Sequence, residues 1–362
     1  MSARRPQRKY VRRRDSIEGA LGVDLGPLIK SRRQVKLEEL HGRVVAIDGY
    51  NALYQFLAVI RGEAGEPLTD SKGRVTSHLS GLYYRTLNLL EKGVKPVYVF
   101  DGKPPELKAQ EIENRIRQRE AARAKYEEAL RRGDVEAART YASLSARLKD
   151  YMVEDAKQLL DALGVPWVQA PSEGEAEAAY LAAKGYAWAS VSQDYDSLLF
   201  GSPVLVRNLT ISGRRKLPKK DVYVEVTPEV LELQQVLEEL GLTREQLVDL
   251  AILIGTDFNP DGIRGIGPVK AYNYIKKYGR LENIAELREE LRSIDYAAIR
   301  RIFLTPDVVD PGKLEWRQPD ERRIVDFLCR EHDFSEERVT NALRRLTASA
   351  PAHTESLDKW FG

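Results

Sequence analysis

Val44-Val45-Ala46-Ile47-Asp48 is a short apolar run that ends in an aspartate, and the chain repeats this pattern twice. The other two cases are residues 97–100, followed by Asp101, and residues 187–191, followed by Asp194 and Asp196. Short β-rich runs without polar alternation are typical of strands buried on both faces of a parallel sheet. Ligands of open α/β sheets lie at the carboxyl ends of the strands. The sequence therefore predicts an α/β fold, with a mostly parallel twisted sheet flanked by helices and with acids along one edge.

Size and composition are those of a globular protein. The chain has 362 residues, of which 43% are hydrophobic and 31% charged. No apolar stretch approaches the roughly 18 to 20 residues of a membrane span, and none follows the basic residues at the start, so we expect neither a signal peptide nor a membrane partner. The single cysteine, Cys329, excludes an intramolecular disulfide and is typical of a reducing cytoplasm. We therefore expect a cytoplasmic protein.

Net charge is unevenly distributed along the chain. Residues 1–20 hold seven basic and two acidic side chains, a net charge of +5, whereas the whole chain is +2, which leaves −3 for residues 21–362. A slightly acidic body binds nucleic acid through local basic patches rather than through its overall charge. Overall charge therefore does not decide the function.

The chain is predicted to contain one main domain between two extensions. The parts are a disordered basic arm at 1–20, a single domain at 21–347, and a flexible tail at 348–362. Within the domain, β/α alternation continues to about Phe200. Two β-leaning stretches follow, at 203–206 and 222–226, and helices are expected from Thr227 onward.

One segment of the domain, residues 103–150, breaks the alternation because it is dense in charge. Its helix propensity is high, but only scattered residues such as Leu107 and Tyr126 could face a core. A helix that is polar on nearly all sides either crosses solvent between two parts of a protein or is ordered only under some conditions. We therefore predict a helical insert that rises from the edge of the sheet.

Acidic residues in five clusters are the candidate metal ligands: Asp48, Asp101, Glu173 with Glu175, Asp194 with Asp196, and Asp257. Mg²⁺ prefers carboxylate and water oxygens, and two such ions about 3.5–4 Å apart can hydrolyse a phosphodiester. Each acid also has a structural interpretation as a cap or turn, and residues 172–175 match a capping box. Five separate clusters favour the metal site. The four histidines are scattered and show no metal-ligand spacing.

A glycine-rich stretch, residues 262–271, lies between two predicted helices at 245–254 and 269–278. This pattern predicts a helix-hairpin-helix, in which Gly265 and Gly267 expose backbone N–H groups to a phosphate and Lys270 adds charge. Such contacts hold the DNA backbone without reading bases. The alternative is a plain glycine-rich connector between helices.

These residues resemble the flap endonuclease family of structure-specific 5′ nucleases, in its archaeal form, from Leu21 to Phe361. The densest matches are residues 46–57, 96–105, 171–178 and 255–258. The resemblance implies a PIN-like 5′ nuclease fold with a helical arch at 103–150 and a helix-hairpin-helix at about 245–280. It also implies that the seven candidate ligands bind two Mg²⁺ ions, which Mn²⁺ can replace, with Asp24 as a further acidic position.

The resemblance assigns roles to residues that the patterns alone do not. Lys108 and Arg115 would contact the scissile phosphate, and Tyr54, which the pattern alone would place in the core, would stack on the nucleotide beside the scissile bond. Four residues match positions around the duplex and the 3′ flap: Arg61, Thr76, Arg85 and Arg207. The hairpin with Gly265, Gly267 and Lys270 matches the family's grip on the duplex, where K⁺ can bind.

Two features depart from the family pattern. Family members begin Met-Gly-Val-Asp, with the glycine near the active site, whereas Leu21-Gly22-Val23-Asp24 follows 20 extra residues here. We predict that the native start is at position 21. In the tail, Leu357, Trp360 and Phe361 match a sliding-clamp motif, but Thr354 stands where the motif has glutamine. We predict clamp binding through this tail, because a terminal Trp-Phe pair is unusual without a partner.

The sequence therefore predicts a monomeric, Mg²⁺-dependent 5′ flap endonuclease with 5′–3′ exonuclease activity. Relatives that act on repair bubbles, recombination junctions or recessed 5′ ends are the nearest alternatives. The short span from Asp101 to Glu173 argues against the bubble-cutting relatives. A non-catalytic junction binder tethered to the clamp is an alternative from a different class, but it would require missing ligands, and all seven candidate ligands are present. A ribonuclease of the same broad fold is a weaker alternative, because such proteins usually lack the hairpin.

Overall fold

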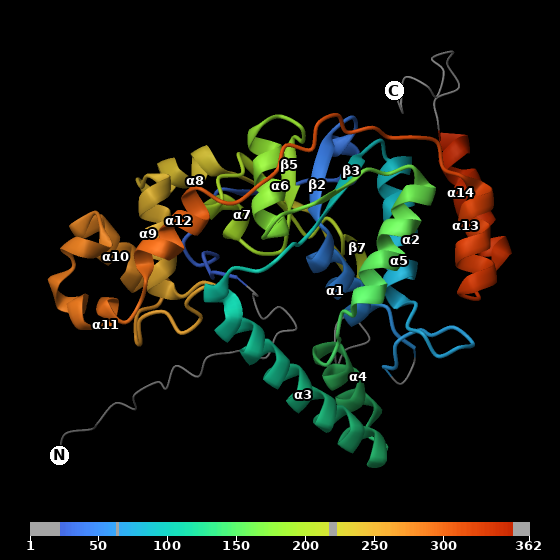
Figure 1. The fold of residues 1–362 in the computed structure, drawn as a ribbon, viewed down its shortest axis with the longest axis horizontal. Coiled ribbons are helices and arrows are strands. Elements are labelled where there is room, and N and C mark those ends of the chain that lie inside the picture. Colours follow the sequence, from blue (N-terminus) through green and yellow to red (C-terminus); the bar gives the residue numbers. More distant parts are fainter. Residues whose placement is uncertain (1–21, 63–64, 217–222, 350–362) are drawn as a thin grey trace.

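The computed structural model describes residues 22–62, 65–216 and 223–349. Its centre is a seven-stranded sheet in the order β1-β9-β6-β5-β2-β3-β4 (Figure 1). Strands β4, β3, β2, β5 and β6 run parallel, β9 pairs antiparallel with β6, and β1 pairs antiparallel with β9, which confirms the prediction of a mostly parallel sheet. A separate hairpin pairs β7 with β8.

The strands are β1 (Arg32–Gln34), β2 (Val44–Asp48), β3 (Lys95–Phe100), β4 (Trp167–Gln169), β5 (Ala189–Val191), β6 (Val204–Arg207), β7 (Gly213–Lys216), β8 (Tyr223–Val226) and β9 (Glu229–Glu232). The α-helices are α1 (Gly49–Val59), α2 (Ser77–Glu91), α3 (Ala109–Arg131), α4 (Val135–Leu144), α5 (Asp150–Leu163), α6 (Gly174–Ala183), α7 (Asp196–Leu199), α8 (Leu233–Leu240), α9 (Arg244–Ile254), α10 (Pro268–Tyr278), α11 (Arg288–Arg292), α12 (Tyr296–Leu304), α13 (Glu321–Val325) and α14 (Glu336–Ser349). Shorter helical turns are η1 (Leu37–Leu40), η2 (Glu106–Lys108), η3 (Leu281–Asn283), η4 (Ala285–Leu287) and η5 (Asp326–Glu331). None of the helices in these described ranges is long and apolar enough to span a membrane.

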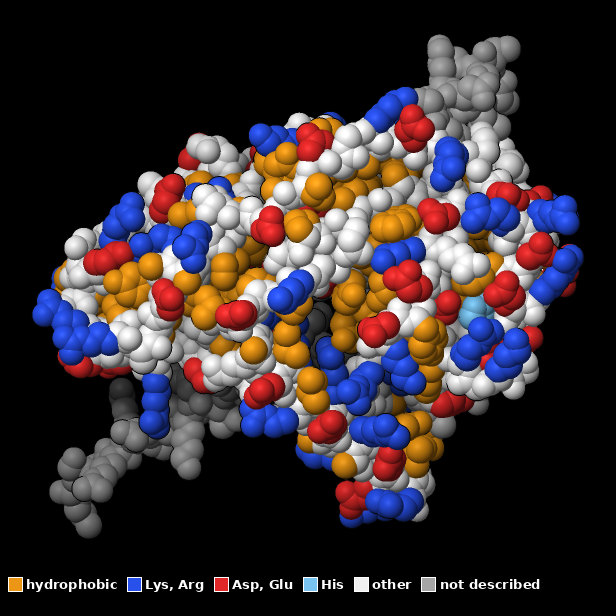
Figure 2. All heavy atoms as spheres, viewed as in Figure 1, with side chains coloured by type: hydrophobic (Ala, Val, Ile, Leu, Met, Phe, Trp, Pro, Cys, Tyr) orange, Lys and Arg blue, Asp and Glu red, His pale blue; other side chains and the backbone are white. Residues whose placement is uncertain are grey.

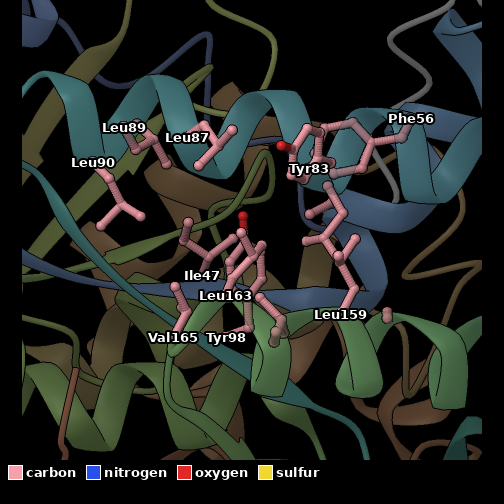
Figure 3. Packing of buried hydrophobic residues seen from close by; sticks show 14 of the residues in the cluster. Ile47, Phe56, Tyr83, Leu87, Leu89, Leu90, Tyr98, Leu159, Leu163 and Val165 are labelled. Carbon is pink, nitrogen blue, oxygen red and sulfur yellow. The ribbon is translucent and has the colours of Figure 1, made fainter. Parts of the chain in front are cut away.

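The central strands are buried on both faces, as the absence of polar alternation predicts. Val45 and Ile47 of β2 belong to a cluster that includes Tyr98 of β3 and side chains of α2 and α5 (Figure 3). Ala46 packs on the opposite face, among residues that include Leu181 of α6. Two helical layers therefore hold the sheet rigidly, and the carboxyl ends of its strands are fixed in place.

One prediction about the second half of the chain is wrong. Helices were expected from Thr227 onward, but residues 229–232 form β9, and the next helix begins at Leu233. Val230 and Leu231 are buried against β6, so antiparallel pairing overrides the helix propensity of this stretch. Strands β1 and β4, each three residues long, were not predicted. All three side chains of β1 are exposed, so the strand leaves no apolar signal in the sequence.

The charged segment forms the helices α3 and α4, which project from the body as a hairpin (Figure 1). Within α3, Ala122 and Ala129 alone are buried, and in α4 the buried residues are Ala138 and Ala142. Small side chains let the two helices pack closely against each other. The rest of α3 is polar, which leaves its surface available for other contacts.

Gly164 at the end of α5 is expected to tolerate no side chain. It adopts the left-handed conformation (φ 68°), and a Cβ there would collide with the backbone carbonyl of Arg317, whose N–H donates to the Gly164 oxygen at 2.8 Å. We expect Gly164→Ala to lower the free energy of unfolding by about 2–4 kcal/mol, from backbone strain plus overpacking. Gly185 is the control, because its φ is 81° but a Cβ added there would meet no atom within 4 Å. Equal losses in chemical unfolding of the two variants would contradict the expectation.

Candidate active site

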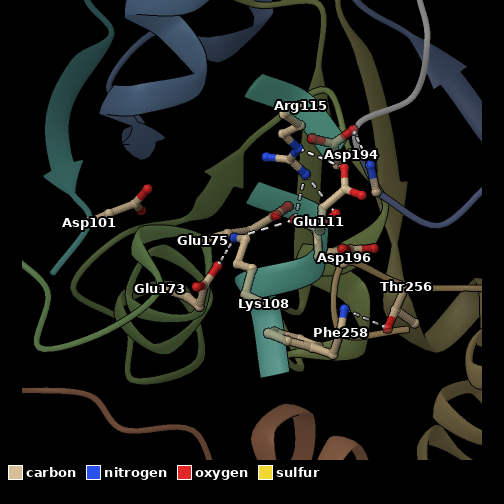
Figure 4. A network of polar contacts seen from close by, with 12 residues as sticks. Asp101, Lys108, Glu111, Arg115, Glu173, Glu175, Asp194, Asp196, Thr256 and Phe258 are labelled. Atoms are coloured by element: carbon tan, nitrogen blue, oxygen red, sulfur yellow. Dashed lines mark hydrogen bonds and ion pairs between the residues drawn. The ribbon is translucent and has the colours of Figure 1, made fainter. Parts of the chain in front are cut away.

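Six of the seven predicted acids follow the carboxyl ends of four neighbouring strands. Figure 4 labels Asp101, Glu173, Glu175, Asp194 and Asp196. Asp48 ends β2, Asp101 follows β3, Glu173 and Glu175 follow β4, and Asp194 and Asp196 follow β5. Asp257 comes from the loop after α9 and reaches the same place, where it contacts two cations from the arch side. The arrangement brings all seven candidate ligands to one edge of the sheet.

Backbone and side-chain donors fix the orientation of these carboxylates. Asp48 accepts from the Asn51 N–H at 2.9 Å, and Asp101 accepts from the Gly174 N–H at 2.6 Å. Both donors lie at the N-terminal ends of helices, α1 and α6, where free N–H groups favour negative charge. Glu175 accepts from the N–H and the hydroxyl of Ser197, at 3.0 and 2.7 Å. The carboxylates are therefore held in place by donors on several separate elements.

The first described residues of the chain reach the same site. The Gly22 N–H donates to Asp194 at 3.2 Å, and the Val23 N–H donates to Asp196 at 3.0 Å. A Cβ on Gly22 would lie 2.8 Å from Asp196 Oδ2, so a side chain at this position would have to push that carboxylate aside. This placement matches what the family resemblance implies for the glycine.

Burial and mutual repulsion disfavour the ionised acids. Burial, followed by the charge of Asp101, raises the pKa of Asp48 to about 8. Burial raises the pKa of Asp101 to about 6 with help from Glu173, and that of Asp194 to about 6 with help from Asp257. The pKa values of Glu175 and Asp196 are also raised well above their ordinary values, first by burial. Such crowding is relieved by cations, and the all-oxygen donor set suits a hard ion such as Mg²⁺.

Two cationic side chains from the arch lie against the acids (Figure 4). Lys108 Nζ contacts Glu173 and lies 3.3 Å from Asp257 Oδ2, while Arg115 Nη2 donates to both oxygens of Asp257 at 2.7 and 2.8 Å. Although burial opposes the charged form, Glu173 and Asp257 raise the pKa of Lys108, which stays protonated. In the described part of the chain, no three His, Cys, Asp or Glu side chains are arranged to hold a metal ion. In this structure Lys108 and Arg115 therefore contact Glu173 and Asp257, and the carboxylates do not point toward one common centre.

Tyr54 and Arg119 form a further contact between the body and the arch. The Arg119 guanidinium carbon lies 4.4 Å from the centre of the Tyr54 ring, and Nη1 donates to the phenol oxygen at 2.9 Å. Tyr54 is half-buried, so it is not the core residue that the sequence pattern alone suggests. In Figure 2 a hollow beside the arch is bordered by Lys and Arg side chains.

The four candidate contacts to the duplex and the 3′ flap are mostly engaged within the protein. Arg85 Nη2 donates to the Ser212 carbonyl at 2.7 Å, and Arg207 Nε donates to the Gln193 carbonyl at 2.9 Å. Arg61 Nη1 donates to the Gly65 carbonyl at 2.9 Å, and Thr76 is only 5% exposed. Their roles in DNA binding stay predictions.

The glycine hairpin presents its backbone to solvent at the start of α10. Gly265 has a φ of 78°, Gly267 caps α10, and a Cβ on either would meet no atom within 4 Å. Ile263 and Ile266 are buried and anchor the loop, while the ammonium of Lys270 lies 3.3 Å from the Gly265 carbonyl. The tail with Thr354, Leu357, Trp360 and Phe361, and the arm at 1–20, lie outside the described residues.

Three residues of the site were missed from the sequence: Asn51, Ser197 and Arg119. Asn51 donates from its N–H to Asp48 and from its side chain to Asp194 at 3.4 Å. Its position three residues after Asp48, in the first turn of α1, was the signal that could have found it. Arg119 follows Lys108 and Arg115 on the arch, and its spacing of four from Arg115 places these two on one face of the helix.

Comparisons with known proteins give a consistent picture. The XPG N-terminal domain matches residues 23–122 and the XPG I-region matches residues 164–257. A protein described as flap endonuclease 1 from Staphylothermus marinus is 59% identical over 349 residues, covering 94% of this chain and all of that protein (100%). The flap endonuclease-1 structure from Methanococcus jannaschii matches with a TM-score of 0.70 at 42% identity, covering 91% of this chain and 98% of the other. The catalytic core of Rad2 in complex with DNA substrate matches with a TM-score of 0.65 at 26% identity, covering 89% and 97%.

Proposed function

Because this chain belongs to the flap endonuclease 1 family, as its resemblance to that family predicted, we propose how its residues divide the work of cutting a 5′ flap. The enzyme is a structure-specific nuclease of DNA replication and repair. It hydrolyses a phosphodiester where a 5′ single-stranded flap meets duplex DNA. The observation that carries the proposal is the set of oriented carboxylates at the sheet edge with Lys108 and Arg115 directly beside them.

Seven acids would hold two Mg²⁺ ions, or Mn²⁺ in their place: Asp48, Asp101, Glu173, Glu175, Asp194, Asp196 and Asp257. When bound, these ions supply the positive charge that activates water and stabilises the leaving oxygen. The donor set supports this proposal because every member offers oxygen and because burial, followed by the charge of neighbouring acids, raises the pKa of Asp48, Asp101 and Asp194. Hydrogen bonds from the N–H groups of Asn51, Gly174 and Ser197 hold the carboxylates of Asp48, Asp101 and Glu175 in position.

The arch cations would turn from the acids to the DNA. Lys108 and Arg115 would then lie beside the scissile phosphate, where their charges would stabilise the charge that builds on that phosphate. Tyr54 would stack on the nucleotide beside the scissile bond. The exposed N–H groups near Gly265 and Gly267, with Lys270, would hold the duplex behind the cut, where K⁺ can bind.

A labelled double-flap DNA tests the proposed activity. We expect cleavage near the base of the 5′ flap with Mg²⁺, and much less cleavage of a matched duplex or of the single strand alone. Binding of the double flap without cleavage by the wild-type chain would instead indicate a junction-binding protein.

Mg²⁺ is expected to raise the melting temperature more at pH 8 than at pH 6. The pKa values of Asp48, Asp101 and Asp194 are raised, so from about 3.8 up to about 8 these carboxyl groups hold more protons in the folded protein than in the unfolded chain. Without divalent ions, stability therefore falls as the pH rises through this window. A metal ion needs ionised ligands, so its stabilising effect grows over the same window. Thermal unfolding with MgCl₂, against NaCl of equal ionic strength, measures the difference; equal shifts at both pH values would contradict it.

We also propose that the enzyme is a monomer and that its tail tethers it to the sliding clamp. Deleting residues 354–362 is expected to weaken clamp binding by at least about tenfold, because Trp360 and Phe361 are large apolar anchors. Cleavage of flap DNA without the clamp should not change. Thr354→Gln restores the residue of the motif and should tighten binding. Unchanged clamp affinity after the deletion, measured by titration, would refute the tether.

A further inference from the structure

We infer that Arg119 competes with a nucleotide base for the face of Tyr54, so that Arg119 is a positioning residue of the reaction. The inference rests on the proposed stacking role of Tyr54. Its structural basis is the double contact between the two side chains: the guanidinium lies over the ring, with its carbon 4.4 Å from the ring centre, and Nη1 donates to the phenol oxygen at 2.9 Å. A base that stacks on the same face must displace the guanidinium.

The placement of Arg119 on the arch supports the competition. Arg117 and Gln118 are exposed, whereas Arg119 is half-buried, because its side chain turns toward the body of the protein. Lys108 and Arg115, which also belong to the arch, contact Glu173 and Asp257. One continuous segment therefore makes the contacts to the acids and to Tyr54.

Competition has a measurable consequence for substrate selectivity. With Arg119 present, an intact base gains its stacking energy but loses the contact between guanidinium and ring. An abasic nucleotide leaves that contact in place. Removing Arg119 removes this penalty for the intact base only. Any contact of Arg119 with a DNA phosphate affects both substrates alike, so it cancels in the ratio between them.

The test uses two flap substrates that differ only at the nucleotide beside the scissile bond, which carries adenine or is abasic. The measured quantity is kcat/KM for the adenine substrate divided by kcat/KM for the abasic substrate. We expect this ratio to be about three to ten times larger in Arg119→Ala than in the wild type, with the change in KM rather than in kcat. Arg123→Ala is the matched control, because Arg123 lies on the same helix and pairs with Glu127 within the arch. It should keep the wild-type ratio.

Tyr54→Ala and the double variant separate the two ways in which the inference can fail. Both are expected to have the same ratio, close to one, because no face remains for the base or the guanidinium. If Tyr54→Ala lowers the ratio but Arg119→Ala leaves it unchanged or smaller, stacking stands and the competition is refuted. If Arg119→Ala and the double variant have the same ratio, the base gains nothing from Tyr54, so the stacking role fails, and the inference fails with it.

Discussion

Asp194→Asn is expected to slow flap cleavage by about 10³-fold or more while leaving DNA binding nearly intact. The amide keeps the size of the carboxylate and can still accept from the Gly22 N–H, so the fold should survive. It removes the negative charge that a metal ion would need. The measurement is single-turnover cleavage of a double-flap DNA, together with binding to the same DNA.

The same variant has a second, independent readout. Burial and the neighbouring charge of Asp257 raise the pKa of Asp194 to about 6. At pH 8 this side chain is ionised, and its ionisation lowers the stability of the folded protein. Without divalent ions, Asp194→Asn should therefore melt at a higher temperature than the wild type at pH 8. Asp261→Asn is the control, because Asp261 is an exposed acid on the loop beside Asp257. A cleavage rate near that of the wild type in Asp194→Asn would exclude Asp194 from the metal site.

Arg115→Ala is expected to reduce the cleavage rate by about 10²–10³-fold, with a smaller effect on DNA binding. The guanidinium donates to both oxygens of Asp257 in this structure, so it would lie beside the scissile phosphate if Asp257 holds a metal ion as proposed. Its loss also leaves Asp257 without this partner, so stability without divalent ions should fall.

Arg117→Ala is the matched control for Arg115→Ala. Arg117 lies two residues away on the same helix, is exposed, and donates to Asn114 at 2.7 Å. It carries the same charge, but its partner belongs to the arch rather than to the acids of the body. Equal losses of cleavage in the two variants would mean that the total charge of the arch, rather than the position of Arg115, supports catalysis.

The central strands and the acids at their ends could be predicted from the sequence because both follow from local patterns. The runs at 44–47, 97–100 and 187–191 are mostly apolar and end beside acids, and parallel strands bring their ends to one edge. The antiparallel strand β9 could not be predicted in the same way. Its sequence favours a helix, and pairing with β6 and β1, two earlier and separate parts of the chain, makes it a strand.

The contacts around the acids could not be predicted from local sequence patterns either. Gly22 and Asp194 are 172 positions apart, and Lys108 and Glu173 are 65 apart. No periodicity reports such pairs. The family resemblance supplied Lys108 and Arg115 as phosphate contacts, but their pairing with Asp257 and Glu173 comes from the three-dimensional structure alone.

The bond between the Val23 N–H and Asp196 has a consequence for how the enzyme is made. The two residues are 173 positions apart, and a ribosome adding about 5–20 residues per second needs roughly 9–35 s to cover that distance. Asp257 is synthesised later still. A nascent chain that already holds β2 and β3 therefore lacks part of the proposed set of metal ligands, and under the proposed mechanism a terminated product that ends before Asp257 would be inactive on DNA.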